Sequence, residues 1–193
     1  MQKVMKGIAK ERGLKPVRGL LLFGPPGTGK TTLARNLGKF LGCEEEKLHF
    51  CSGPQFWDKY LGESERKIRE LFEPAERDAL LYGDKSELHI FIIDEIDALL
   101  PNREERGSEH LRGGINQFLT KLDGLNQLNN ILNVGTTNRP QLIDPAALRP
   151  GRLEVHLQID LPKEQDRIQI LKIHTKQLRE NNLIAADVNL THI

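Results

Sequence analysis

The stretch GPPGTGKT, residues 24–31, decides the fold. It fits the pattern GxxxxGK[ST] and lies between an apolar run at 19–23, GLLLF, and a segment at 30–42, KTTLARNLGKFLG, with apolar residues at helical spacing. A strand, a glycine-rich loop and a helix in this order form a P-loop, whose backbone N–H groups and helix N-terminus surround phosphate groups. The sequence therefore predicts a phosphate-binding site at this loop.

Each residue type in the loop has an expected role toward a nucleoside triphosphate. Lys30 is expected to reach the β- and γ-phosphates, and Thr31 to offer its hydroxyl to Mg²⁺. The residues expected to contact the nucleotide from this segment are Gly24, Pro26, Gly27, Thr28, Gly29, Lys30, Thr31 and Thr32.

A second segment, IFIIDEID at 90–97, reads as a buried strand that ends in two acids. Beside a P-loop strand, such acids can hold Mg²⁺ and activate water, so we assign Asp94 to the metal ion and Glu95 to the attacking water. Asp97 is better explained as an acid in the first turn of a helix, where it complements the helix dipole.

The segment NVGTTNRP at 133–140 ends another expected strand in polar residues. Thr136, Thr137 and Asn138 could touch the γ-phosphate or the attacking water. Ordinary turn chemistry explains the same residues, and this pattern alone leaves both explanations open.

The order of apolar runs and helical patterns predicts an α/β fold, a P-loop NTPase with a doubly wound, five-stranded parallel sheet. Ligands in such folds bind beyond the carboxyl ends of the strands. A helix at 64–83 is expected to kink or break at Pro74. We place a nucleotide-binding subdomain at 1–162 and the incomplete start of a helical lid, with a helix over 163–181, at 163–193. The expected strands are 19–23, 47–52, 88–93, 129–135 and 154–159.

Composition narrows the class of protein. The chain has 193 residues, of which 38% are hydrophobic and 28% charged, with a net charge of +1, as in soluble globular proteins. The balanced charge gives no sign of nucleic-acid binding. No apolar run approaches the ~20 residues of a membrane span, and the basic start lacks the apolar core of a signal peptide. Two cysteines without a metal-binding pattern fit free thiols in the cytoplasm.

The stretch LRPGRLE at 148–154 holds Arg149 and Arg152 around a proline-glycine turn, with Glu154 as the one acid close by. A solvated loop can carry both guanidinium groups without a role, or the two groups can reach for a negative charge elsewhere.

Together, the motifs GPPGTGKT, IIDEID, GTTNRPQLIDPAALRPGRLE and KYLGESE resemble the AAA+ ATPases of the classical AAA subgroup over residues 14–180. Within the subgroup, the chain is most similar to the first ATPase domain of the vesicle-fusing ATPases, the N-ethylmaleimide-sensitive factor type. The valosin-containing-protein type is the next most similar.

This resemblance implies a homo-hexamer that binds ATP and Mg²⁺ between neighbouring subunits. Asn138 would be the first sensor, and Arg149 and Arg152 the arginine fingers that contact the γ-phosphate held by the next subunit. The two arginines would then lack a partner within this chain, and in a single copy both side chains should be exposed and poorly ordered. His174 would lie near the ribose. A pore loop made of Lys59, Tyr60 and Leu61 would grip the substrate polypeptide.

By the same resemblance the substrate is a SNARE complex, presented by an adaptor, and the protein is peripheral to membranes at most. A general protein unfoldase or segregase, or a nucleotide-gated scaffold, are the alternatives; the presence of Glu95 argues against the scaffold. The charged stretch 102–110 fits either a second pore loop or a solvated loop. We expect the chain to be a fragment that is largely monomeric and binds nucleotide poorly.

Overall fold

The computed structural model describes residues 17–57, 62–102, 109–124, 130–181, 183–184 and 188. The chain forms two compact units, of which the first ends at Ile159 and the second begins at Asp160.

The first unit is built on a parallel sheet with the strand order β2-β3-β4-β1-β5. This confirms the predicted doubly wound, five-stranded α/β fold. Its strands and helices, in chain order, are β1 (Gly19–Phe23), α2 (Lys30–Phe40), β2 (Leu48–Ser52), α3 (Glu63–Tyr82), β3 (His89–Asp94), α4 (Ile96–Leu99), α5 (Glu109–Gly124), β4 (Ile131–Thr137) and β5 (Val155–Gln158).

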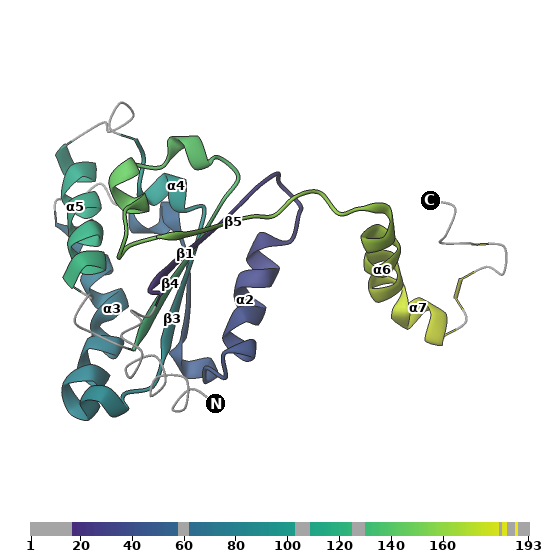
Figure 1. Cartoon of the computed structure of the whole chain (residues 1–193), viewed down its shortest axis with the longest axis horizontal. Coiled ribbons are helices and arrows are strands. Elements are labelled where there is room, and N and C mark those ends of the chain that lie inside the picture. The colour runs from purple at the N-terminus through teal and green to yellow at the C-terminus, as the bar shows by residue number, and fades with distance from the viewer. Residues whose placement is uncertain are drawn as a thin grey trace. The chain divides into compact units, whose positions relative to one another are not determined.

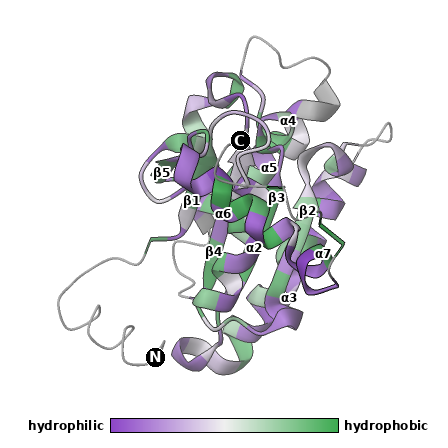
Figure 2. Ribbon diagram, turned by 90° about the vertical axis from the view of Figure 1, so that its right-hand side faces the viewer, coloured by the Kyte–Doolittle hydropathy of each residue, from purple (hydrophilic) through white to green (hydrophobic). Residues whose placement is uncertain are grey.

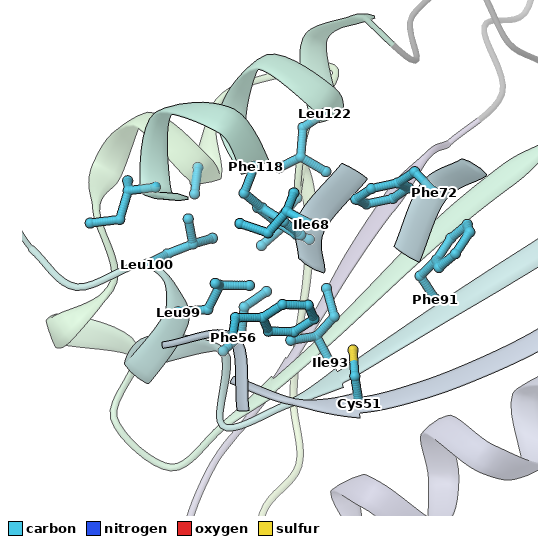
Figure 3. Close-up of a cluster of buried hydrophobic side chains, with 14 of the residues drawn as sticks. Cys51, Phe56, Ile68, Phe72, Phe91, Ile93, Leu99, Leu100, Phe118 and Leu122 are labelled. Carbon is cyan, nitrogen blue, oxygen red and sulfur yellow. The ribbon is translucent and has the colours of Figure 1, made fainter. Parts of the chain in front are cut away.

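The sheet separates two hydrophobic layers because successive side chains of a strand point to opposite faces (Figures 1 and 2). On one face, Ile90 and Ile92 of β3 pack with Ala34 of α2. On the other face, Phe91 and Ile93 join the cluster formed by α3 and α5 (Figure 3). Burial on both sides explains why β3 reads as a continuous apolar run.

The strand register brings the functional segments to one edge of the sheet. In β1 and β4, Phe23 pairs with Thr137, and in β3 and β4, Ile93 pairs with Gly135. Asp94 therefore ends its strand beside Thr136. The P-loop follows β1 directly, so the two acids and the polar end of β4 meet it at the carboxyl edge.

Helix α3 runs unbroken from Glu63 to Tyr82, so of the kink or break expected at Pro74, the break is wrong. Proline has no N–H to donate to the carbonyl four residues earlier, that of Glu70. Both residues are exposed, so water can bind that carbonyl, while Phe72 and Ala75 anchor the opposite side of the helix in the core.

Helix α5 was not predicted, because its two adjacent glycines are poor helix formers. The glycines allow close packing instead: a Cβ added to Gly114 would lie 2.8 Å from the ring of Trp57 and 3.2 Å from Cβ of Ser64. Burial of Ile115, Phe118 and Leu122 outweighs the low helix propensity. Of the charged stretch at 102–110, residues 103–108 lie outside the described residues.

The second unit contains α6 (Glu164–His174) and α7 (Lys176–Glu180) in place of the single helix expected over 163–181. Thr175 separates them, with φ −94° and ψ 4°. Its hydroxyl donates to the carbonyl of Leu171 at 2.7 Å, a side-chain bond that competes with the helix backbone. None of the residues of α6 and α7 is buried. Among the described helices, none has the length and apolar character needed to cross a bilayer.

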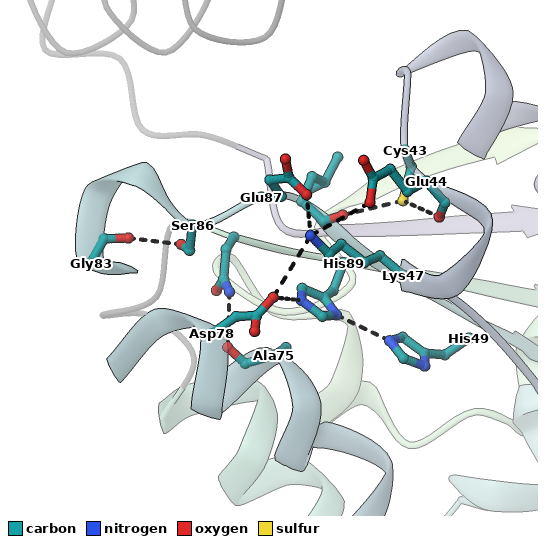
Figure 4. Close-up of polar contacts among 12 residues, drawn as sticks. Cys43, Glu44, Lys47, His49, Ala75, Asp78, Gly83, Ser86, Glu87 and His89 are labelled. Atoms are coloured by element: carbon teal, nitrogen blue, oxygen red, sulfur yellow. Dashed lines mark hydrogen bonds and ion pairs between the residues drawn. The ribbon is translucent and has the colours of Figure 1, made fainter. Parts of the chain in front are cut away.

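A polar cluster joins α3 to the amino ends of β2 and β3 (Figure 4). His89 is buried, and its ring nitrogens contact Asp78 Oδ2 at 2.9 Å and His49 Nε2 at 3.1 Å. Lys47 pairs with Glu87 nearby. The cluster lies at the opposite ends of these strands from the P-loop, so it supports the fold rather than the phosphate site.

Candidate functional site

A cleft of about 570 Å³ opens at the carboxyl edge of the sheet. The P-loop and the start of α2 form one wall, and the ends of β3 and β4 with α4 form the other. The lining residues are Pro26, Gly27, Gly29, Lys30, Thr31, Thr32, Pro54, Asp94, Glu95, Asp97, Ala98, Thr136, Thr137, Asn138 and Arg139. Gly24 and Thr28 belong to the loop but not to this lining.

The P-loop keeps Lys30 close to its own backbone. Gly24, Gly27 and Gly29 have φ values of 147°, 75° and 87°, a region that L side chains rarely adopt. Lys30 is 7% exposed, and its ammonium donates to the carbonyls of Gly24 at 3.0 Å and Pro25 at 2.6 Å. Burial lowers the pKa of Lys30, and the negative charge of Asp94 opposes that shift.

The carboxylate of Asp94 joins three segments. It accepts hydrogen bonds from the hydroxyl of Thr31 at 3.0 Å, from the hydroxyl of Thr136, and from the backbone N–H of Glu95 at 3.2 Å. Hydroxyl and carboxylate oxygens are ligands that Mg²⁺ prefers, usually with water and phosphate oxygens completing the shell. The described residues hold no cluster of three His, Cys, Asp or Glu that could bind a metal ion.

Glu95 occupies a left-handed backbone conformation, with φ 53° and ψ 47°, immediately before α4. Such a conformation costs about 1–3 kcal/mol in a non-glycine residue and persists where the surroundings enforce it. Gly53 contributes to this: a Cβ there would come within 2.3 Å of the Glu95 carbonyl oxygen. The exposed side chain of Glu95 lines the cleft.

Asp97, which the sequence explained only as an acid that complements a helix dipole, is hydrogen-bonded to the end of β4. Asp97 does lie in the first turn of α4, but it is buried and bonded to Thr137 and Arg139. Asn138, between those two residues, is exposed and lines the cleft. The position of Asp97 inside an apolar run, between Ile96 and Leu99, is the sequence signal for its burial.

A family model for the ATPase family associated with various cellular activities (AAA) matches residues 20–161. This chain belongs to the AAA family. The match covers the strands, helices and cleft of the first unit, except that β1 begins one residue before it.

Several curated AAA relatives share about half of the residues of this chain. A vesicle-fusing ATPase of Caenorhabditis elegans is 52% identical over 95% of the chain, and the vesicular-fusion protein sec18 of Schizosaccharomyces pombe is 48% identical over 97%. A protein of Acanthamoeba polyphaga mimivirus named as an AAA family ATPase is 47% identical over 97%. The chain spans 22%, 24% and 23% of the length of these relatives, respectively.

The arginine turn of this AAA domain differs from the prediction. Arg149–Arg152 form a turn closed by a 3.1 Å bond from the Arg152 N–H to the Arg149 carbonyl, with φ 84° at Gly151. Arg149 is exposed, but Arg152 is bonded to Asp123 and to the carbonyl of Ala146. The expectation that both arginines are exposed and lack a partner is therefore wrong for Arg152, whose side chain is 14% exposed. Asp123 lies on α5, the helix that was not predicted.

Four predicted site residues remain. Lys59, Tyr60 and Leu61 lie outside the described residues. His174 is the exposed last residue of α6, in the second unit.

Proposed function

We propose that this chain is the ATP-hydrolysing module of a protein-remodelling machine. The observation that carries the proposal is the convergence of Lys30, Thr31, Asp94, Glu95 and Asn138 on one cleft beside a P-loop. Membership in the AAA family and the names of the relatives support the same reaction.

In this proposal the P-loop binds the phosphates of ATP. Lys30 exchanges its two loop carbonyls for phosphate oxygens, and the resulting charge-assisted bonds are the stronger ones. Thr31 and Asp94 would hold Mg²⁺, which when bound offsets the charge of the phosphates.

Glu95 then orients the attacking water and accepts its proton. Its exposed carboxylate lines the cleft, and its strained backbone conformation fixes the direction in which the side chain leaves the strand end. Asn138 would contact the γ-phosphate or the same water from the other side of the cleft. General-base catalysis of this kind contributes roughly 10²–10⁴-fold in rate.

The two arginines would act on the cleft of a neighbouring copy in a six-membered ring. Neither Arg149 nor Arg152 lines the cleft of its own chain, and Arg149 is exposed. An arginine supplied across an interface can add roughly 10³–10⁵-fold in rate.

The substrate we propose is a SNARE complex, which an adaptor presents to a cytoplasmic protein that is peripheral to membranes at most. Lys59, Tyr60 and Leu61 would hold the substrate polypeptide. The vesicle-fusing relatives favour this substrate. The net charge of +1 argues against nucleic acid. A general unfoldase is the alternative, and adding an adaptor-bound SNARE bundle distinguishes the two: ATP-dependent release supports our proposal, and no release favours the alternative.

The trans arrangement is tested by mixing two variants of the full-length protein. One variant is Glu95→Gln, and the other carries Arg149→Ala with Arg152→Ala. Each alone should hydrolyse ATP slowly. In mixed rings, the arginine variant keeps Glu95 and can receive arginines from a Glu95→Gln neighbour, so activity should partly recover. A mixture no faster than the two variants measured separately would contradict the proposal.

A further inference from the structure

Helix α4 and the end of β4 are joined by a closed ring of hydrogen bonds that the proposed chemistry does not use. Asp97 Oδ1 accepts from the hydroxyl of Thr137 at 2.6 Å, and Asp97 Oδ2 accepts from Nη2 of Arg139 at 3.0 Å. The ring closes where the backbone N–H of Arg139 donates to the Thr137 hydroxyl at 2.9 Å.

The ring is built around a buried charge. Asp97 is 6% exposed and Thr137 2%, whereas the side chain of Arg139 is 62% exposed. A buried carboxylate is costly unless it is paired and hydrogen-bonded, and here both of its oxygens have a partner. Fully satisfied buried networks hold their members in one arrangement, so the ring should fix the end of β4 relative to α4.

Asn138 lies in the chain between the two residues that bind Asp97. Both of its chain neighbours, Thr137 and Arg139, are bonded to Asp97, and Thr136 before them is bonded to Asp94. Of these four consecutive residues, Asn138 is the one whose side chain is exposed at the cleft without a bond to either acid among the described contacts.

We propose that Asp97 is a positioning residue that sets the Asn138 amide in the cleft through Thr137 and Arg139. The proposal rests on the proposed function, in which Asn138 acts on the γ-phosphate or the attacking water. A misplacement of about 1 Å in such a group can cost roughly 100-fold in rate, so the ring should matter for turnover through the position of Asn138.

The first test compares Asp97→Asn with and without Asn138→Ala in the full-length protein. Asparagine keeps the size of the side chain and removes the charge that pairs with Arg139. Asp97→Asn should lower kcat roughly 10-fold or more while leaving KM for ATP within about twofold. In the Asn138→Ala background the same substitution should change kcat by less than about twofold, because its effect passes through Asn138. An equal fold loss in both backgrounds would overturn the proposal.

Thr137 gives a second test that keeps the charge pair intact. Thr137→Val removes the hydroxyl at nearly constant shape, whereas Thr137→Ser keeps it. The kcat of Thr137→Ser should stay at least about threefold above that of Thr137→Val. Equal rates for the two variants, each folded by circular dichroism, would contradict the ring's role.

Hydrogen exchange separates this inference from the proposed function. In the protein without nucleotide, backbone exchange over residues 136–141 should be faster in Asp97→Asn than in the wild type. Unchanged exchange there overturns the positioning role, whatever the ATPase rates. A wild type that hydrolyses no ATP would refute the proposed function instead, while faster exchange would still support the ring as the support of Asn138.

Discussion

Arg152 forms a bidentate ion pair with Asp123, in which Nε donates to Oδ1 at 2.7 Å and Nη2 donates to Oδ2 at 2.5 Å. The third nitrogen, Nη1, donates to the carbonyl of Ala146 at 2.5 Å. The pair joins positions 29 residues apart and ties the arginine turn to α5. For Arg152 to reach a phosphate of another subunit, this pair has to open.

The first prediction concerns the strength of that pair. Asp123→Asn should lower the free energy of unfolding by about 1 kcal/mol, because the geometry is bidentate but Asp123 is half exposed to water. Urea denaturation measures the difference, which should shrink at high salt. Glu46→Gln, at an exposed acid with no ion pair among the described contacts, is the control and should change little. An Asp123→Asn midpoint equal to that of the wild type would contradict the prediction.

His49 should make stability depend on mildly acidic pH. Burial, and then the neighbouring His89, lower the pKa of His49 below its ordinary value of 6.5. Below pH ~6.5 the unfolded chain therefore binds this proton more readily than the folded chain, and the free energy of unfolding falls as pH decreases toward the folded pKa. Denaturation at pH 7.5 and pH 5.5 should show a smaller difference in His49→Gln than in the wild type, whereas exposed His174→Gln should keep the wild-type difference. If the stability of His49→Gln differed between the two pH values as much as that of the wild type, the prediction would be refuted.

Gly53 should be intolerant of any side chain. The Cβ of Gly53→Ala would lie 2.3 Å from the Glu95 carbonyl oxygen and 3.2 Å from the Leu99 nitrogen, so backbone has to move. We expect a loss of about 3 kcal/mol in stability. Gly42→Ala is the control: Gly42 has φ 65° with open space around it, so the change should cost about 1 kcal/mol. Equal losses for the two variants, measured by thermal denaturation, would show that the close approach does not matter.

Lys30 should control nucleotide affinity. Its ammonium is the cation inside the loop, bonded to carbonyls that phosphate oxygens would replace. Lys30→Ala should weaken binding of a fluorescent ATP analogue at least about 10-fold, since charge-assisted bonds contribute about 1.5–3 kcal/mol each. Lys39→Ala, at an exposed lysine in the last turn of α2, should bind as the wild type does. Undiminished binding by Lys30→Ala would place the nucleotide elsewhere.

The parts of the site that follow from short sequence patterns could be predicted. The glycines around Lys30 and the acids after β3 depend on local chain geometry, and the parallel order brings the ends of β1, β3 and β4 together. The bounds of β1 and β2 agree with the expected runs to within one residue.

Contacts between distant segments could not be predicted. The partner of Arg152 lies on α5. Gly113 and Gly114 lower the helix propensity of this segment, and the helix is stabilised by tertiary packing instead. Asp97 is close to a recognisable acid pair, yet its partners are the last residue of β4 and Arg139 just after it, 40 and 42 residues later. Helix α3 continues through Pro74 because this side of the helix is exposed to water, and a local sequence pattern does not reveal exposure.

The most direct test of the central claim, that this cleft hydrolyses ATP with Glu95 as the base, is a single-turnover measurement on the full-length protein. Wild type and Glu95→Gln are loaded with Mg²⁺ and radiolabelled ATP, and bound nucleotide and released phosphate are followed together. We predict that Glu95→Gln binds ATP within about threefold of the wild type but hydrolyses it at least roughly 100-fold more slowly. Phosphate release by Glu95→Gln at the wild-type rate would contradict the account.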